Sequence, residues 1–256
     1  MKIFALECGG AVASLAALEI WGDGAELAAN AAIEEPRALS RLVMARFDTV
    51  LEEAGWKIED LNGLAIGVGP GSWTSLRIGL STFKTLAQTL SIPLAGVPTF
   101  DAIASATIRA RLETLPRRKK SKILDLEPRI ALVLAPCRPG ALYGKIFEMS
   151  ADSLAPMQAE WIAPAKMHLD GAYSQGLASE IEPPLLLCGE AAGEAAQLLE
   201  ARGEAYEIAE VAPEAIALEI ALAGAAQIVA GEAGSPLEVA PLYLAPSHAE
   251  RHLAGF

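Results

Sequence analysis

Cysteine and histidine are scarce in this sequence, which limits the scaffolds and sites that it can form. Its 256 residues include three cysteines, Cys8, Cys137 and Cys188, and three histidines. An odd number of distant cysteines without a C-x-x-C pair indicates neither a disulfide framework nor a zinc knuckle. We therefore expect reduced thiols in a cytoplasmic protein.

The few histidines do not predict a metal or catalytic site. His248 and His252 stand in an H-x-x-x-H pair, a spacing that places two imidazoles on one helix face. Ala249, however, stands where the glutamate of H-E-x-x-H would be, and His168 is distant in the sequence. No Ser/His/Asp or Cys/His set can be assembled either. We expect no catalytic and no metal-binding residues.

Long apolar runs are missing as well. Glu7 interrupts the apolar N-terminal stretch before it reaches the length of a signal peptide. The longest apolar region, 215–231, is shorter than the ~20 residues of a membrane span, and it contains Glu219 and Gln227. We expect a buried helix there and no membrane association. The composition, 52% hydrophobic and 20% charged residues, is that of a folded globular protein.

Positive charge is outweighed by negative charge. The chain has 20 Lys and Arg against 32 Asp and Glu, a net charge of −12, so we do not expect it to bind nucleic acid by itself. Residues 109–129 are the exception, because they hold Arg109, Arg111, Arg117, Arg118, Lys119, Lys120, Lys122 and Arg129. A solvated linker is the favoured interpretation of this segment. Contact with a nucleic acid held by a partner is the alternative.

Strand and helix patterns are clear in the first hundred residues. In order, we expect strands at 2–6, 12–20 and 26–33, a helix at 36–54, a strand at 63–68, a helix at 76–90 and a strand at 94–97. A less regular copy follows, with strands at 129–136, 141–149 and 184–190, a helix at 191–202, a strand at 205–211 and a helix from 213.

This order is typical of a ribonuclease-H-like unit. We therefore predict an α/β fold of two ribonuclease-H-like lobes, the actin, Hsp70 and sugar-kinase (ASKHA) architecture, with a cleft between the lobes and a smaller, less regular second lobe. The predicted parts are an N-terminal lobe at 1–108, a basic linker at 109–128 and a C-terminal lobe at 129–256.

The glycine-rich stretch GPGSWTSLR, residues 69–77, follows a predicted strand and precedes a predicted helix. It lacks the lysine of a G-x-x-x-x-G-K-[ST] phosphate loop and misses the dinucleotide-binding spacing. Two interpretations stay open. The stretch is either a rigid turn or an anion site built from exposed amides and hydroxyls at a helix start. The residues concerned are Gly69, Gly71, Ser72, Thr74 and Arg77.

Residues 67–104 closely resemble the signature of the TsaB (YeaZ) family, which supports threonylcarbamoylation of tRNA. Arg77, Ile78, Gly79, Lys84, Leu86 and Ala87 are in register with the family pattern. Two tripeptides depart from it. Glu7-Cys8-Gly9 replaces Asp-Thr-Ser after the first strand, and Pro136-Cys137-Arg138 replaces Asp-Ala-Arg in the second lobe. Both changes fall where a nucleotide pocket would lie, so no cofactor is expected.

The resemblance implies a non-catalytic scaffold subunit with a rigid glycine-rich turn. Such a subunit binds a TsaD-like catalytic subunit and works with a TsaE-like ATPase, and it meets tRNA through the complex. A homodimer is compatible with it.

The docking surface would lie on the two first-lobe helices, with Leu39, Leu42, Met44, Phe47, Ile78 and Phe83. Alternatively, these apolar faces cover the lobe's own sheet. An independent actin-like ATPase or kinase, and a metallopeptidase, are the competing functions.

Overall fold

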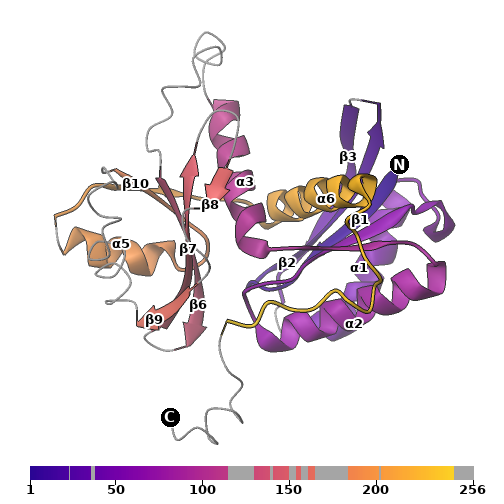
Figure 1. Cartoon of the computed structure of the whole chain (residues 1–256), viewed down its shortest axis with the longest axis horizontal. Coiled ribbons are helices and arrows are strands. Elements are labelled where there is room, and N and C mark those ends of the chain that lie inside the picture. The colour runs from indigo at the N-terminus through magenta and orange to yellow at the C-terminus, as the bar shows by residue number, and fades with distance from the viewer. Residues whose placement is uncertain are drawn as a thin grey trace, which may run out of the picture.

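Two β-sheets lie side by side in the computed structural model, with helices between and around them (Figure 1). The structure describes residues 1–22, 24–35, 38–114, 130–138, 141–149, 154–156, 161–164, 184–201 and 203–244. Both sheets combine strands with helices packed on their faces, which confirms the prediction of a two-lobed α/β fold.

The first sheet contains the five strands predicted in the first hundred residues. They are β1 (Lys2–Glu7), β2 (Ala13–Trp21), β3 (Gly24–Ile33), β4 (Gly63–Gly67) and β5 (Leu94–Val97). Their order in the sheet is β3-β2-β1-β4-β5. The first three strands form the predicted antiparallel meander, while β4 and β5 continue the sheet in parallel from β1.

Helices cover both faces of this sheet because its central strands β1 and β4 are apolar and buried on both sides. They are α1 (Leu39–Glu53), α2 (Trp73–Leu90) and α6 (Pro213–Ala230). Phe4 of β1 packs with Phe47 and Phe83 of α1 and α2, at ring centroid distances of 4.2 and 6.5 Å. Ile3 and its neighbours on the other face pack against α6.

Helix α6 lies where the sequence predicts a buried helix. It is long and apolar enough to cross a membrane by length and composition alone. In this fold it packs along β1, β2, β4 and β5 as a core helix of the first lobe. Gly224 allows the close approach, since a Cβ there would lie 2.4 Å from the Cβ of Ala65.

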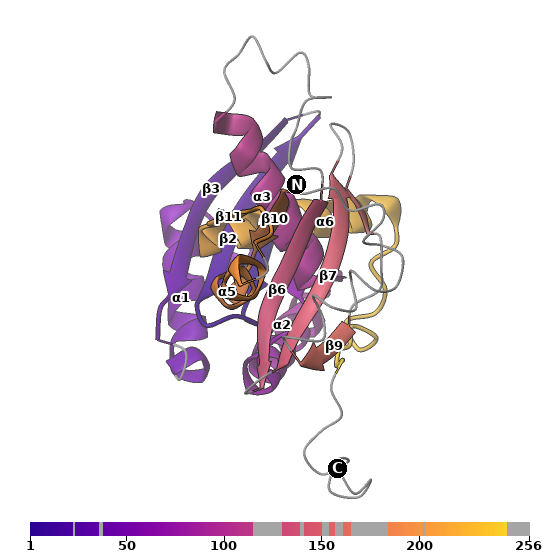
Figure 2. The ribbon, with the colours of Figure 1, turned by 90° about the vertical axis from the view of Figure 1, so that its left-hand side faces the viewer.

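The second sheet repeats the strand arrangement of the first. Its elements are β6 (Ile130–Arg138), β7 (Ala141–Met149), β8 (Leu154–Pro156), β9 (Trp161–Pro164), β10 (Leu185–Cys188), helix α5 (Ala192–Glu200) and β11 (Tyr206–Ala209). The central strand β6 pairs antiparallel with β7 and parallel with β10, which pairs parallel with β11. In Figure 2 helix α5 lies in front of this sheet.

Each sheet is completed by a helix that follows a strand of the other sheet. Helix α3 (Thr99–Thr114) follows β5 of the first sheet, yet its Phe100 and Ile103 pack with Val133 and Phe147 of the second sheet. Helix α6 follows β11 of the second sheet and packs on the first. The two exchanged helices contact each other between the sheets (Figure 1).

Helix α3 also changes the interpretation of the basic segment. It runs through Thr114, so the first residues of the predicted linker are helical. Arg109 forms an ion pair with Glu219 of α6, and Arg111 Nη1 lies 2.8 Å from Glu207 Oε2 of β11. These two cations therefore serve the fold. The other six basic residues lie outside the described residues, and the linker there stays a prediction.

Candidate functional site

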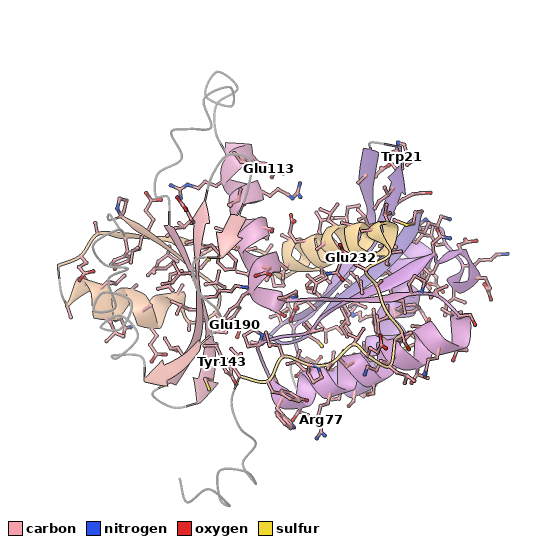
Figure 3. All side chains as sticks on the ribbon, in the orientation of Figure 1. Trp21, Arg77, Glu113, Tyr143, Glu190 and Glu232 are labelled. Carbon is pink, nitrogen blue, oxygen red and sulfur yellow. The ribbon has the colours of Figure 1, made fainter. Side chains whose placement is uncertain are left out.

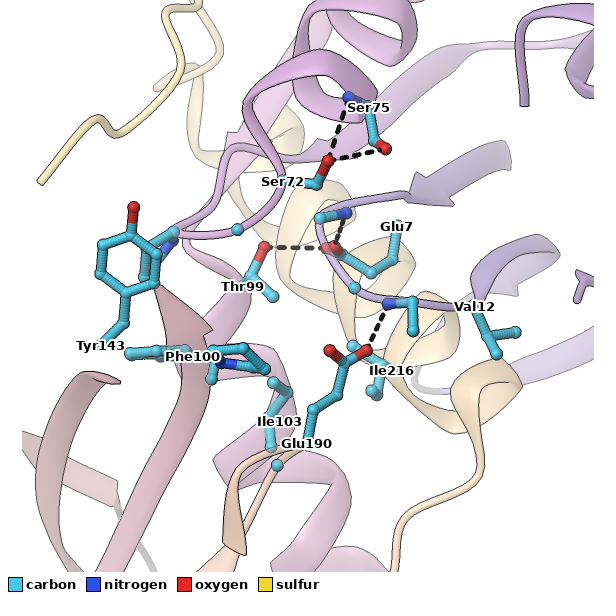
Figure 4. Close-up of a pocket in the computed structure, with 18 of the residues that line it drawn as sticks. Glu7, Val12, Ser72, Ser75, Thr99, Phe100, Ile103, Tyr143, Glu190 and Ile216 are labelled. Atoms are coloured by element: carbon cyan, nitrogen blue, oxygen red, sulfur yellow. Dashed lines mark hydrogen bonds between the residues drawn. The ribbon is translucent and has the colours of Figure 1, made fainter. Parts of the chain in front are cut away.

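A cleft of about 1880 Å³ lies between the two lobes. Its first-lobe side is formed by the loop after β1, at 9–12, and the glycine-rich loop, at 70–75. Its second-lobe side is formed by the end of β6, the turn after β10, and the segment from β11 to α6. Figure 4 shows these loops converging from both sheets, as the carboxyl ends of strands do in open α/β sheets.

Glu7 lies at the base of the cleft and is 3% exposed. Its Oε1 accepts a hydrogen bond of 2.5 Å from the Gly9 backbone N–H, and its Oε2 accepts one of 2.8 Å from the Thr99 hydroxyl (Figure 4). Burial raises the pKa of Glu7 above its usual value, while these hydrogen bonds act in the opposite direction. Gly67 makes room for the carboxylate, because a Cβ at this position would lie 1.7 Å from Glu7 Oε2.

A second carboxylate enters the cleft from the other lobe. Glu190, in the turn after β10, accepts a hydrogen bond from the Ala11 backbone N–H in the loop after β1 (Figure 4). Backbone amides in a loop of this kind can donate hydrogen bonds to a bound anion. In this structure Gly9 and Ala11 donate to the protein's own carboxylates instead.

The charge of the cleft is negative. Its lining carries Glu7, Glu190 and Glu210, and the described lining residues include no Lys, Arg or His. The remaining lining is uncharged, and it includes residues from the starts of α2, α3 and α6. Phosphate groups would therefore meet like charge without a balancing cation.

The conformation of the glycine-rich loop depends on two glycines and on contact with the loop after β1. Gly69 has φ +99°, a backbone conformation that favours glycine. Gly71 lies against the first loop, where a Cβ would approach the Gly9 carbonyl oxygen to 2.4 Å. Ser72 N–H donates to this same oxygen at 2.7 Å. The two loops thus hold each other in place through their backbones.

Helix α2 begins at Trp73, earlier than the sequence indicates. Ser72 is its N-cap, with Oγ accepting from the Ser75 N–H at 3.4 Å. Thr74 lies inside the first turn and lines the cleft, so it does not cap the helix. Of the five predicted loop residues, Gly71, Ser72 and Thr74 line the cleft; Gly69 and Arg77 do not.

Arg77 contacts an aromatic pair that the sequence analysis missed. Its guanidinium lies over the Trp73 ring, 5.2 Å from the centroid, and Figure 3 shows it pointing away from the protein. Trp73 also stacks on Tyr243 with a centroid distance of 3.8 Å. No local pattern connects Trp73 and Tyr243, since they are brought together by the chain segment that returns after α6.

The predicted docking residues divide by burial. Leu39, Phe47 and Phe83 are in the core with exposures of 3%, 0% and 0%, and they serve the lobe's own packing. Leu42 and Ile78 are partly buried against this core. Met44 is 38% exposed and is the predicted docking residue most available to a partner.

The histidines and cysteines form no further candidate site among the described residues. The three histidines lie outside the described residues, and within the described part no cluster of His, Cys, Asp and Glu could hold a metal ion. Cys8 and Cys188 are buried, which raises the pKa of both thiols, that of Cys188 to about 12. Neither is a thiolate nucleophile at neutral pH.

Comparisons with known proteins point to one group. A family model described as "TsaD: tRNA N6-adenosine threonylcarbamoyltransferase" matches residues 32–116. The chain is 33% identical over 110 residues to "tRNA threonylcarbamoyladenosine biosynthesis protein TsaB" of Escherichia coli, covering 43% of this chain and 45% of that protein. It is 35% identical over 57 residues to Bacillus subtilis TsaB, covering 22% and 25%. The chain thus spans less than half of the length of these relatives.

The fold extends the likeness beyond these matched segments. The solved structure of YeaZ from Pseudomonas aeruginosa superposes with a TM-score of 0.66 over 94% of this chain and 100% of that chain, at 16% sequence identity. At this identity the likeness concerns the fold alone, and it agrees with the two ASKHA-type lobes. The chain is therefore similar to TsaB proteins in sequence over part of its length, and to a solved YeaZ structure in fold over nearly all of it.

Proposed function

We propose that this protein takes part in tRNA threonylcarbamoyladenosine biosynthesis as a non-catalytic subunit that binds a TsaD-like catalytic subunit. The non-catalytic role rests on the hydrogen bonds and the charge of the cleft. The Gly9 and Ala11 amides of the loop after β1 are taken by Glu7 and Glu190, and the described lining of the cleft offers no cation to a phosphate. The pathway follows from the matched TsaB relatives.

The binding role rests on helices α1 and α2. The TsaD family model matches residues 32–116, which include both helices, so this chain and TsaD-like proteins have related sequences there. Related surfaces can pack against each other around a pseudo-twofold axis. Helix α2 contains no acidic residue, although the chain has a net charge of −12. Such a surface has little negative charge to desolvate when a partner covers it.

Reconstitution tests the proposal. The mixture contains this chain, TsaD-like and TsaE-like proteins, and ATP, threonine and bicarbonate with an enzyme that makes threonylcarbamoyl-adenylate from them. In this mixture, threonylcarbamoyl transfer to tRNA should proceed. Transfer should stop when this chain alone is omitted. Transfer at an undiminished rate without it would contradict the scaffold role. The TsaE-like partner, indirect tRNA contact and a homodimer are parts of the same proposal.

An independent ATPase or kinase is the second candidate, because the cleft lies where an actin-like fold binds nucleotide. Calorimetric titration of the isolated chain with ATP and Mg²⁺ separates the two functions. We expect no saturable heat and no phosphate release. Turnover by the isolated chain would favour the enzyme.

A further inference from the structure

We propose that Glu190 is an interlobe clasp, which keeps the cleft closed by binding the first loop of the opposite lobe. Glu190 belongs to the turn between β10 and α5 of the second sheet, and its Oε1 accepts from the Ala11 N–H between β1 and β2 of the first sheet. The bond therefore spans the cleft (Figure 4). The contact is exposed to solvent, and a bond from an amide to a carboxylate is stronger than one between neutral groups.

The backbone on both sides is shaped for this bond. Gly189 has φ +90°, and a Cβ there would lie 2.2 Å from the Leu134 carbonyl oxygen. Glycine thus permits the turn that directs Glu190 toward the first lobe. On the other side, a Cβ at Gly10 would lie 2.5 Å from Glu190 Oε1. Glycine at this position leaves the carboxylate room to reach Ala11.

The position of the bond explains why it acts as a clasp. The lobes also meet where α3 crosses α6, and there Arg109 pairs with Glu219. Rotation of the lobes about this crossing would widen the cleft, and Glu190 would have to release Ala11 for it to proceed. An anionic ligand that bound the same amide would likewise have to displace Glu190. The closed form and an anion-bound form are thus mutually exclusive.

Amide hydrogen exchange at Ala11, followed by NMR, tests the contact directly. Glu190→Ala should speed this exchange at least tenfold, whereas Glu190→Gln, whose side-chain oxygen can still accept the bond, should retain most of the protection. Gly10→Ala pushes the carboxylate away from the opposite lobe without removing it, so it should give the same acceleration as Glu190→Ala.

Distance measurement between spin labels tests the closure. One nitroxide is placed at the exposed Gln88 on α2 and the other at the exposed Glu200 on α5, in a Cys137→Ser background. Both Glu190→Ala and Gly10→Ala should lengthen and broaden the distance distribution, while Glu190→Gln should resemble the parent. Circular dichroism verifies that each variant is folded. If Gly10→Ala, folded, leaves both the exchange and the distances unchanged, the clasp is refuted whatever Glu190→Ala does.

Discussion

At the scale of single residues, Glu7 is the group that the fold has to accommodate most carefully. A buried carboxylate is costly unless hydrogen bonds replace the water that it loses. Gly9 N–H and the Thr99 hydroxyl supply these bonds, and Gly67 supplies the space. Thr99 Oγ1 also accepts from the Gly69 N–H at 3.1 Å, so the buried carboxylate is connected to the glycine-rich loop.

The raised pKa of Glu7 predicts a pH dependence of stability. Between its ordinary value of 4.5 and the raised value, the folded state binds more protons than the unfolded state, so the free energy of unfolding should fall as the pH rises through this window. Glu7→Gln removes this contribution. In urea denaturation from pH 4.5 upward, the wild type should lose stability relative to Glu7→Gln. Parallel curves for the two proteins would contradict this.

Gly67→Ala should destabilise the protein by about 3 kcal/mol, because the new methyl group displaces the Glu7 carboxylate from Thr99. Gly193→Ala is the matched control, since a Cβ there meets nothing within 4 Å. In the helical backbone of α5 it should be neutral or stabilise by up to about 1 kcal/mol. Chemical denaturation measures both. Equal effects at the two positions would refute the role assigned to Gly67.

At the scale of elements, the spacing of apolar residues predicted those strands and helices that depend on neighbouring residues in the sequence. The spacing of apolar residues predicts the strands of the first sheet and helix α1. The N-terminal part of the predicted linker was interpreted wrongly, because Arg109 and Arg111 read as solvated charge. Their partners, Glu219 and Glu207, lie in distant elements. The Glu190 contact spans 179 residues and is equally invisible to a local pattern.

The exposed part of α1 gives a prediction about the proposed partner. Met44→Glu should abolish binding to a TsaD-like subunit, because it would bury a charge in the interface without changing the core. Val229→Glu, on the more exposed end of α6, is the control and should bind like the wild type. Calorimetry with the purified partner measures both affinities. Unchanged binding of Met44→Glu would remove α1 from the proposed surface.

At the scale of the whole molecule, one ion pair joins the exchanged helices. The Glu219 side chain is 8% exposed and the Arg109 side chain is 49% exposed. Arg109→Met would leave a buried carboxylate without its cation, and it should destabilise by about 2 kcal/mol, since water still reaches part of the site.

Arg41→Met is the control for this substitution, because Arg41 and Glu35 form a pair whose side chains are 73% and 70% exposed. Its effect on the free energy of unfolding should stay within about 0.5 kcal/mol. If the two variants unfold at the same urea concentration, the Arg109–Glu219 pair does not join the lobes energetically.

The exchange of helices also sets the order in which the protein can be completed on the ribosome. The strands of the first sheet have all been synthesised once Val97 is added, but the helix that covers one of their faces begins only at Pro213. Until then Ile3, Ala5 and their apolar neighbours lack the α6 side chains that pack on them in the finished protein. Domains usually fold in the order of synthesis. Here the lobe that is made first is the one that is finished last.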